Sequence, residues 1–200
     1  MKGMRFFIIG AAIFVGLTVS ACVAEQTENA TGDDSTSDTL PPVNSPALGQ
    51  KILFEYTYIN FAWGFQCYGY YVDSGGNVWK YRYGEDDEIW QPEDPNNLSE
   101  SQLLGKYSHN STLAATTDRE TVHQMAALIP AAAAGELTDR RNEANDMGSI
   151  VYLAYTFDPS SGLYHPVRLL IGGDWYAKND APEADSLLKW FRTILIDWQD

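Results

Sequence analysis

The chain has 200 residues, and its 13 Lys and Arg against 27 Asp and Glu give a formal net charge of −14 at pH 7. So acidic a chain has no general attraction for nucleic acid or for anionic lipid headgroups, because like charges repel, and we expect no nucleic-acid partner. Its 6 Trp, 12 Tyr and 8 Phe predict an aromatic-rich core, and its length suits one domain with appendages.

Residues 1–21 have the composition of a secretory signal peptide. Lys2 and Arg5 form a short positive region, and an uncharged run of 14 residues from Phe6 to Val19 follows. A membrane span needs about 20 apolar residues. The run is therefore short for a permanent transmembrane helix and fits the hydrophobic region of a signal peptide.

The signal peptide ends in Val19-Ser20-Ala21-Cys22, which resembles the lipobox of bacterial lipoproteins, an aliphatic residue and two small residues before a cysteine. The resemblance covers residues 1–22 only. It implies cleavage before Cys22, lipid attachment to the Cys22 thiol, and a stable anchor of two or three acyl chains. The residue after the cysteine, Val23, is not Asp, so the resemblance favours the outer membrane if the host is Gram-negative. The alternatives are an ordinary secretory peptide or an uncleaved anchor.

Residues 22–49 are predicted to be a disordered acidic tether between the lipidated Cys22 and a single folded domain, residues 50–200. The stretch from Ala24 to Gly49 contains five acidic residues and three prolines but neither Lys nor Arg. Such a segment buries too little apolar surface to offset the entropy lost on ordering. With Cys22 lipidated, Cys67 has no intramolecular partner, so no disulfide scaffold is expected.

The folded domain is predicted to begin with three strands. Over residues 52–58 apolar residues alternate with Glu55 and Thr57, which is the period of a half-buried strand with these two on its polar face. Strands predicted over residues 65–72 and 78–83 flank a turn sequence rich in Gly and Asp, so these two strands should form a hairpin.

Helical signals follow the strands. Residues 84–97 form an acidic, proline-bearing loop, and a short helix is expected after Ser99. Thr117 and Glu120 form a capping-box pattern before a second helix, which Pro130 should kink or end. A second hairpin is predicted from strands over residues 149–157 and 164–171.

The last helix is predicted to run from residue 181 to about residue 197, with Asp180 as its cap. Its apolar stripe comprises Leu187, Leu188, Phe191, Ile194, Leu195 and Trp198. The order of elements predicts an α+β domain: an antiparallel sheet built from two hairpins and a leading strand, with helices packed on one face.

The candidate binding residue is Trp63. Twelve aromatic residues fall between Phe54 and Tyr83, and Trp63 lies in a predicted loop between two strands, where a side chain can be exposed. An exposed ring there would stack on a sugar or on an aromatic side chain of a partner. The alternative is that these aromatic residues form core.

The sequence gives little indication that Cys67 is a catalytic nucleophile or that the three histidines bind a metal ion. A nucleophilic Cys67 would need His109, His123 or His165 as its base, but it lies mid-strand among aromatic residues, which favours a buried, inert thiol. The histidines are not spaced as metal ligands, so neither a metal site nor a cofactor is predicted.

Two further patterns in the sequence are similar to known sites. The acidic residues from Glu85 to Asp94 offer the hard oxygen ligands that calcium prefers but do not match an EF-hand loop, which favours a solvated segment. Ser186 and Lys189 match the Ser-x-x-Lys motif of penicillin-binding enzymes, whose other elements are absent from this sequence.

Three hypotheses of function remain. The leading one is a lipoprotein of the cell envelope whose folded domain binds a protein or a glycan without catalysis. The alternative is a cell-envelope hydrolase with a carboxylate pair drawn from Glu55, Asp73, Glu85 or Asp174, since retaining glycosidases place two carboxyls about 5 Å apart. The third is an inhibitor or immunity-type protein whose acidic surface meets a basic target.

Overall fold

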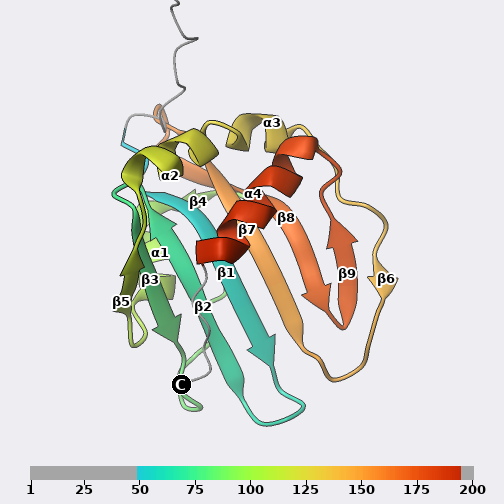
Figure 1. The fold of residues 1–200 in the computed structure, drawn as a ribbon. Helices are drawn as coiled ribbons and strands as arrows, with labels where there is room; N and C mark the ends of the chain where they lie inside the picture. Colours follow the sequence, from blue (N-terminus) through green and yellow to red (C-terminus); the bar gives the residue numbers. More distant parts are fainter. Residues whose placement is uncertain (1–48, 195–200) are drawn as a thin grey trace, which may run out of the picture. The chain divides into compact units, whose positions relative to one another are not determined.

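The computed structural model describes residues 49–194, which form an antiparallel sheet with four helices (Figure 1). The strands are β1 (Ile52–Asn60), β2 (Gln66–Asp73), β3 (Asn77–Arg82), β4 (Leu98–Ser99), β5 (Thr112–Thr116), β6 (Arg141–Asn142), β7 (Ser149–Asp158), β8 (Leu163–Gly173) and β9 (Trp175–Lys178). The helices are α1 (Glu100–Tyr107), α2 (Arg119–Ala126), α3 (Ile129–Ala133) and α4 (Pro182–Ile194). The predicted signal peptide, Cys22 and nearly all of the predicted tether lie outside the described residues.

Strand β1 lies in the middle of the sheet. The strand order is β5-β3-β2-β1-β7-β8-β9-β6, and β4 pairs with β8 outside this path. Every neighbouring pair is antiparallel, and both predicted hairpins, β2–β3 and β7–β8, are confirmed. On β1, Glu55 lies opposite Tyr71 of β2 and Leu153 of β7, so these three side chains share one face of the sheet.

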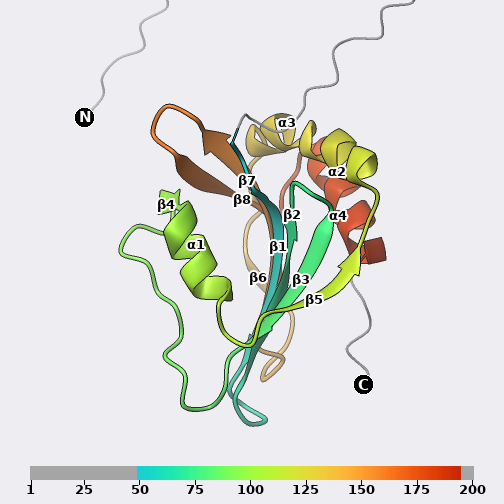
Figure 2. The same ribbon diagram turned by 90° about the vertical axis from the view of Figure 1, so that its left-hand side faces the viewer.

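Helices α2, α3 and α4 cover the other face, which we call the helix face, the one that carries Phe54 and Tyr152 (Figure 2). In α4 the predicted apolar stripe is buried at Leu187, Leu188 and Phe191, and Ile194 packs against the same core. Leu195 and Trp198, the last two residues of that stripe, lie outside the described residues.

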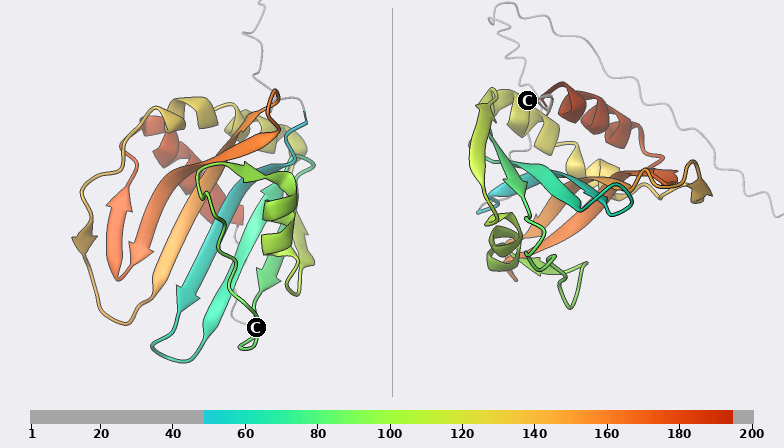
Figure 3. Two further views of the ribbon diagram at one scale, coloured as in Figure 1. Left: turned by 180° about the vertical axis from the view of Figure 1, so that it is seen from behind. Right: turned by 90° about the horizontal axis from the view of Figure 1, so that it is seen from below.

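The face that carries Glu55 and Tyr155, here called the pocket face, is also covered. Figure 3 shows α1 and the acidic segment, residues 84–97, lying across it. Leu103 and Tyr107 of α1 are buried against it. The α+β fold with an antiparallel sheet is thus confirmed, and α2, α3 and α4 lie on one face as predicted. The short helix expected after Ser99 forms as α1 but packs on the opposite face, so the helices cover both faces and not one. No described helix is long and apolar enough to cross a membrane.

Two predicted helix caps are wrong by position. Asp118, not Thr117, caps α2, and its carboxylate accepts a hydrogen bond from the backbone N–H of Thr121 at 2.8 Å. Thr117 is fixed in another way, because its backbone N–H donates a hydrogen bond to the carbonyl of Gly76 in the β2–β3 turn. Asp180, the predicted cap of the last helix, instead accepts a hydrogen bond from the N–H of Glu136 at 2.9 Å.

Candidate functional site

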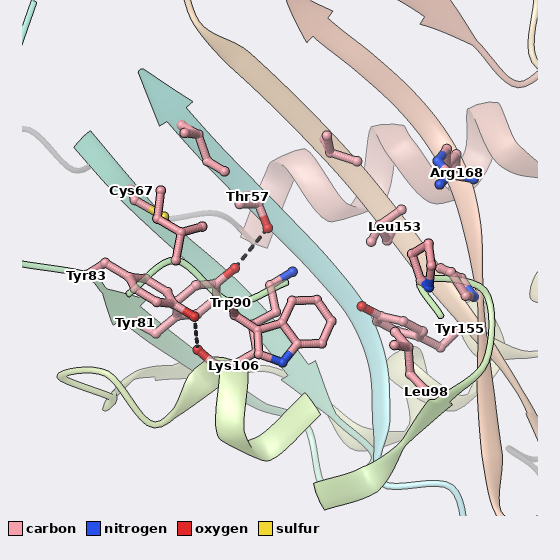
Figure 4. Close-up of a pocket in the computed structure, with 15 residues that line it drawn as sticks. Thr57, Cys67, Tyr81, Tyr83, Trp90, Leu98, Lys106, Leu153, Tyr155 and Arg168 are labelled. Atoms are coloured by element: carbon pink, nitrogen blue, oxygen red, sulfur yellow. Dashed lines mark hydrogen bonds between the residues drawn. The ribbon is translucent and has the colours of Figure 1, made fainter. Parts of the chain in front are cut away.

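A pocket of about 270 Å³ lies on the pocket face, between the sheet and the acidic segment (Figure 4). Its walls are mostly apolar or aromatic, and they come from seven parts of the chain: β1, β2, β3, β7, β8, the acidic segment with β4, and α1. The residues used below are Thr57, Cys67, Tyr81, Trp90, Lys106, Val151, Leu153, Tyr155 and Arg168. Because these elements are distant in sequence, the pocket exists only once the sheet has assembled.

Glu55 lies beneath the pocket and is fully buried, so its predicted place on a polar, solvent-facing side of the first strand is wrong. The physical reason is the cover that α1 provides on this face. One carboxylate oxygen accepts hydrogen bonds from Tyr81, Thr57 and Lys106. The other accepts hydrogen bonds from the hydroxyls of Tyr107, at 2.7 Å, and Tyr155.

These donors keep the Glu55 carboxylate ionised in the interior. Burial alone would raise its pKa, but the positive charge of Lys106 and hydrogen bonds from Lys106, Thr57 and Tyr155 outweigh burial, so the pKa is lowered. Burial, together with the negative charge of Glu55, holds the pKa of each of the tyrosines far above its usual value; these are Tyr81, Tyr107 and Tyr155. The cluster is therefore one carboxylate and one ammonium among neutral phenols, with its polar groups paired to one another.

The local sequence explains how these groups meet. Gly69 lies opposite Thr57 on β1 and Tyr81 on β3. A Cβ on Gly69 would come within 2.4 Å of the Tyr81 hydroxyl, so glycine leaves the space that the phenol needs to reach Glu55. Helix α1 delivers Lys106 and Tyr107 together, and its start is fixed by a capping box between Ser99 and Gln102.

The pocket has one unpaired cationic group. The Lys106 ammonium is paired with Glu55 and lies 5.0 Å from the centre of the Trp90 ring. Arg168, by contrast, is exposed on β8 beside Leu153, and its guanidinium has no partner among residues 49–194. The result is an apolar pocket with a positive charge at its edge.

Cys67 lines the same pocket and is buried, as predicted. Burial raises the pKa of its thiol to about 11, which leaves it protonated at neutral pH. No histidine within the described chain lines this pocket: His109 stacks on Tyr83, His123 contacts the carbonyl of Ser74, and His165 contacts the carbonyl of Asn96. The structure therefore gives Cys67 no histidine base.

The four candidate carboxylates of the hydrolase hypothesis do not come together. None of the five groups that bond to Glu55 is a carboxylate. Asp73 organises the β2–β3 turn through hydrogen bonds from backbone N–H groups and from the Trp79 indole. Asp174, in the β8–β9 turn, accepts a hydrogen bond from the backbone N–H of Met147. Glu85 is exposed in the acidic segment.

Residues 49–194 contain no group of three or more His, Cys, Asp and Glu side chains placed to hold a metal ion. In the acidic segment, Asp87 accepts a hydrogen bond from Gly84, and Asp94 binds the amide of Asn97. Ser186 donates its hydroxyl to the carbonyl of Pro182 within α4, on the helix face and away from the pocket.

Trp63 is 76% exposed in the β1–β2 turn, as its predicted loop position required. Its indole N–H donates to the backbone oxygen of Asp146 at 3.0 Å. It does not line the pocket described above. The sequence predicted neither the pocket nor the place of Lys106 in it; the spacing of Leu103 and Tyr107 on α1 is its one signal that this face is also packed.

Comparison of the chain with protein-family models, with curated proteins and with solved structures gives no match.

Proposed function

We propose that the chain is a lipoprotein of the cell envelope whose folded domain binds a small, largely apolar ligand without catalysis. The lipobox at Cys22 supports the anchor, and the pocket on the pocket face supports the binding domain. The observation that carries the proposal is an apolar pocket whose buried polar groups already satisfy one another. Apolar pockets with a few placed polar groups are the usual form of small-molecule sites.

The charged group at the edge of the pocket indicates the chemical class of the ligand. Arg168 presents an unpaired guanidinium beside the apolar walls, and a guanidinium binds carboxylate, sulfonate or phosphate through paired hydrogen bonds. We therefore propose a ligand with an apolar body and one anionic group.

The polar cluster supports binding rather than catalysis. A general acid or base works best with a pKa near the operating pH. Glu55 has a lowered pKa and is held by several donors, whereas the neighbouring phenols and Cys67 have raised pKa values. On this view the role of Glu55 is to position Lys106 and Tyr155 in the pocket wall.

Titration calorimetry with naphthalene-2-sulfonate tests the proposal, because this probe joins an apolar body to one anionic group. The protein is the chain from residue 22 to residue 200 with Cys22→Ser, which prevents acylation. We expect saturable binding of one probe, and about ten-fold weaker binding to Arg168→Gln, which corresponds to about 1.4 kcal/mol.

A substitution that fills the pocket, compared with one on the exposed side of α1, tests whether the probe binds in the pocket. Val151→Trp should abolish binding, whereas Leu104→Trp, on the exposed side of α1, should bind like the parent protein. Thermal unfolding of each variant checks that it is folded. Unchanged binding to folded Val151→Trp, or equal binding of the matched cation 2-naphthylmethylammonium, would contradict the proposal.

A further inference from the structure

A second exposed feature lies at one end of the sheet. Seven large apolar side chains of the described residues are exposed, and four of them gather at this end: Phe61, Trp63, Met147 and Trp175. We call the segments that carry these side chains the aromatic rim; they are the β1–β2 turn, residues 143–148, and the β8–β9 turn with Trp175, the first residue of β9. Apolar side chains gathered on a surface in this way mark interaction sites, whereas isolated ones do not.

The rim is held rigid by hydrogen bonds between its loops. The backbone oxygen of Asp146 accepts hydrogen bonds from Trp63 Nε1 and Asn60 Nδ2, each at 3.0 Å. The backbone N–H of Asp174 donates to the carbonyl of Gly148 at 2.8 Å. A Cβ on Gly173 would come within 2.2 Å of that same carbonyl oxygen, so glycine is needed for the loops to approach.

A groove of about 400 Å³ lies within the rim and is lined by both rings and polar groups. Phe61 and Trp175 supply aromatic surface, and the Arg140 guanidinium lies 5.1 Å from the centre of the Trp175 ring. Neither Arg140 nor the Asp146 carboxylate has a hydrogen-bond or ion-pair partner within the described part of the chain. The groove thus offers one free donor and one free acceptor beside flat apolar rings.

We propose that the aromatic rim is a binding surface for neutral polysaccharide. A sugar ring has an apolar C–H face that packs on an aromatic ring and hydroxyls that both donate and accept hydrogen bonds. The rim supplies each kind of contact: the faces of Phe61 and Trp175, the donor Arg140 and the acceptor Asp146. The N–H of the Trp63 indole already donates to the backbone oxygen of Asp146, so the exposed part of this ring offers only apolar surface to a ligand. The rigid loops also reduce the ordering cost of binding.

The charge of the chain argues against a membrane as the occupant. Residues 22–200 carry 11 basic and 27 acidic side chains, which is 11 − 27 = −16, and Asp146 lies in the rim itself. Such a surface is repelled by anionic headgroups. The groove also differs from the pocket of the proposed function: they share Ile59, and no other residue lines both.

Co-sedimentation tests the proposal, with residues 22–200 carrying Cys22→Ser and three insoluble neutral glycans: cellulose, chitin and a β-1,3-glucan. We expect retention on at least one of them. Trp175→Ala and Asp146→Asn should each lower the bound fraction at least ten-fold at limiting glycan. The matched control is Leu113→Ala, which removes an equally exposed apolar side chain from β5 and should bind normally.

Two outcomes overturn the proposal. One is retention on none of the three glycans by protein that is shown to be folded by thermal unfolding. The other is retention on vesicles of phosphatidylglycerol that Trp63→Ala and Trp175→Ala abolish while glycan retention is absent. Val151→Trp, which fills the pocket, should leave glycan retention unchanged, so failure of this proposal and failure of the proposed function are distinguishable.

Discussion

Glu55 is the residue whose environment says most about this domain. A buried carboxylate is tolerated because hydroxyls of tyrosine and threonine and the Lys106 ammonium replace the water that it loses. A buried ion pair of this kind adds little net stability compared with an apolar pair, but removal of one partner leaves the other charge unpaired. The cluster therefore fixes the geometry of the pocket wall more than it drives folding.

Glu55→Gln should lower the free energy of unfolding by about 3–5 kcal/mol at neutral pH, because Lys106 then loses its counter-charge. The pKa of Glu55 is lowered in the folded state. The ionised Glu55 carboxylate therefore stabilises the folded protein fully at a pH above its unfolded-state pKa of about 4.3. This stabilisation is lost as the pH falls below that value and through the folded-state pKa of Glu55. Denaturant unfolding from about pH 7 to about pH 3 measures this.

The two proteins should therefore converge in stability on acidification. Tyr81→Phe serves as the control, because it removes the hydrogen bonds of one phenol, to Glu55 and Thr57, and keeps both charges. A difference between the parent protein and Glu55→Gln that stays constant over the acid range would mean that the carboxylate is not held ionised by this cluster.

At the scale of the elements, regular amphipathic patterns were predictable from the sequence and the cover of the pocket face was not. The β2–β3 hairpin, which contains Tyr81, and the apolar stripe of α4 could be predicted from the sequence. In each of them large apolar residues recur with the period of a strand or of a helix. Helix α1 buries only Leu103 and Tyr107, too few to mark a packed face. The pocket depends on register: Tyr155 reaches Glu55 across 100 residues of sequence, and no local pattern predicts that meeting.

Phe191 tests whether α4 belongs to the core. Its ring is fully buried and lies 5.8 Å from the ring of Phe54 and 5.9 Å from that of Tyr152. Phe191→Ala should cost about 3–5 kcal/mol, a large share of the stability of a typical domain. Lys189→Ala, on the exposed side of the same helix, should leave the thermal midpoint almost unchanged. An unchanged midpoint for Phe191→Ala would instead make the helix a docking element.

At the scale of the whole molecule, the proposed binding surfaces would be presented at the envelope by an anchor and a tether. The tether contains no Lys or Arg from Ala24 to Gly49, so both it and the acidic domain are repelled by anionic headgroups. Membrane attachment of the proposed lipoprotein would then depend on its acyl chains alone. This arrangement would hold the domain away from the lipid surface and leave its pocket and its aromatic rim accessible.

The two cysteines make the anchor directly testable, because each serves as the control for the other. Cys22→Ala should abolish incorporation of a radioactive fatty acid and move the protein from the detergent phase to the aqueous phase, since the lipobox thiol is the proposed site of lipid attachment. Cys67→Ala should keep both the label and the detergent partition, because Cys67 is buried in β2 and its pKa is raised to about 11. Stable anchoring takes two lipid chains or one chain with a basic patch, and the acidic tether offers no such patch. Label retained by Cys22→Ala would show that another residue carries the lipid, and label lost from folded Cys67→Ala would show that the lipobox alone does not direct acylation.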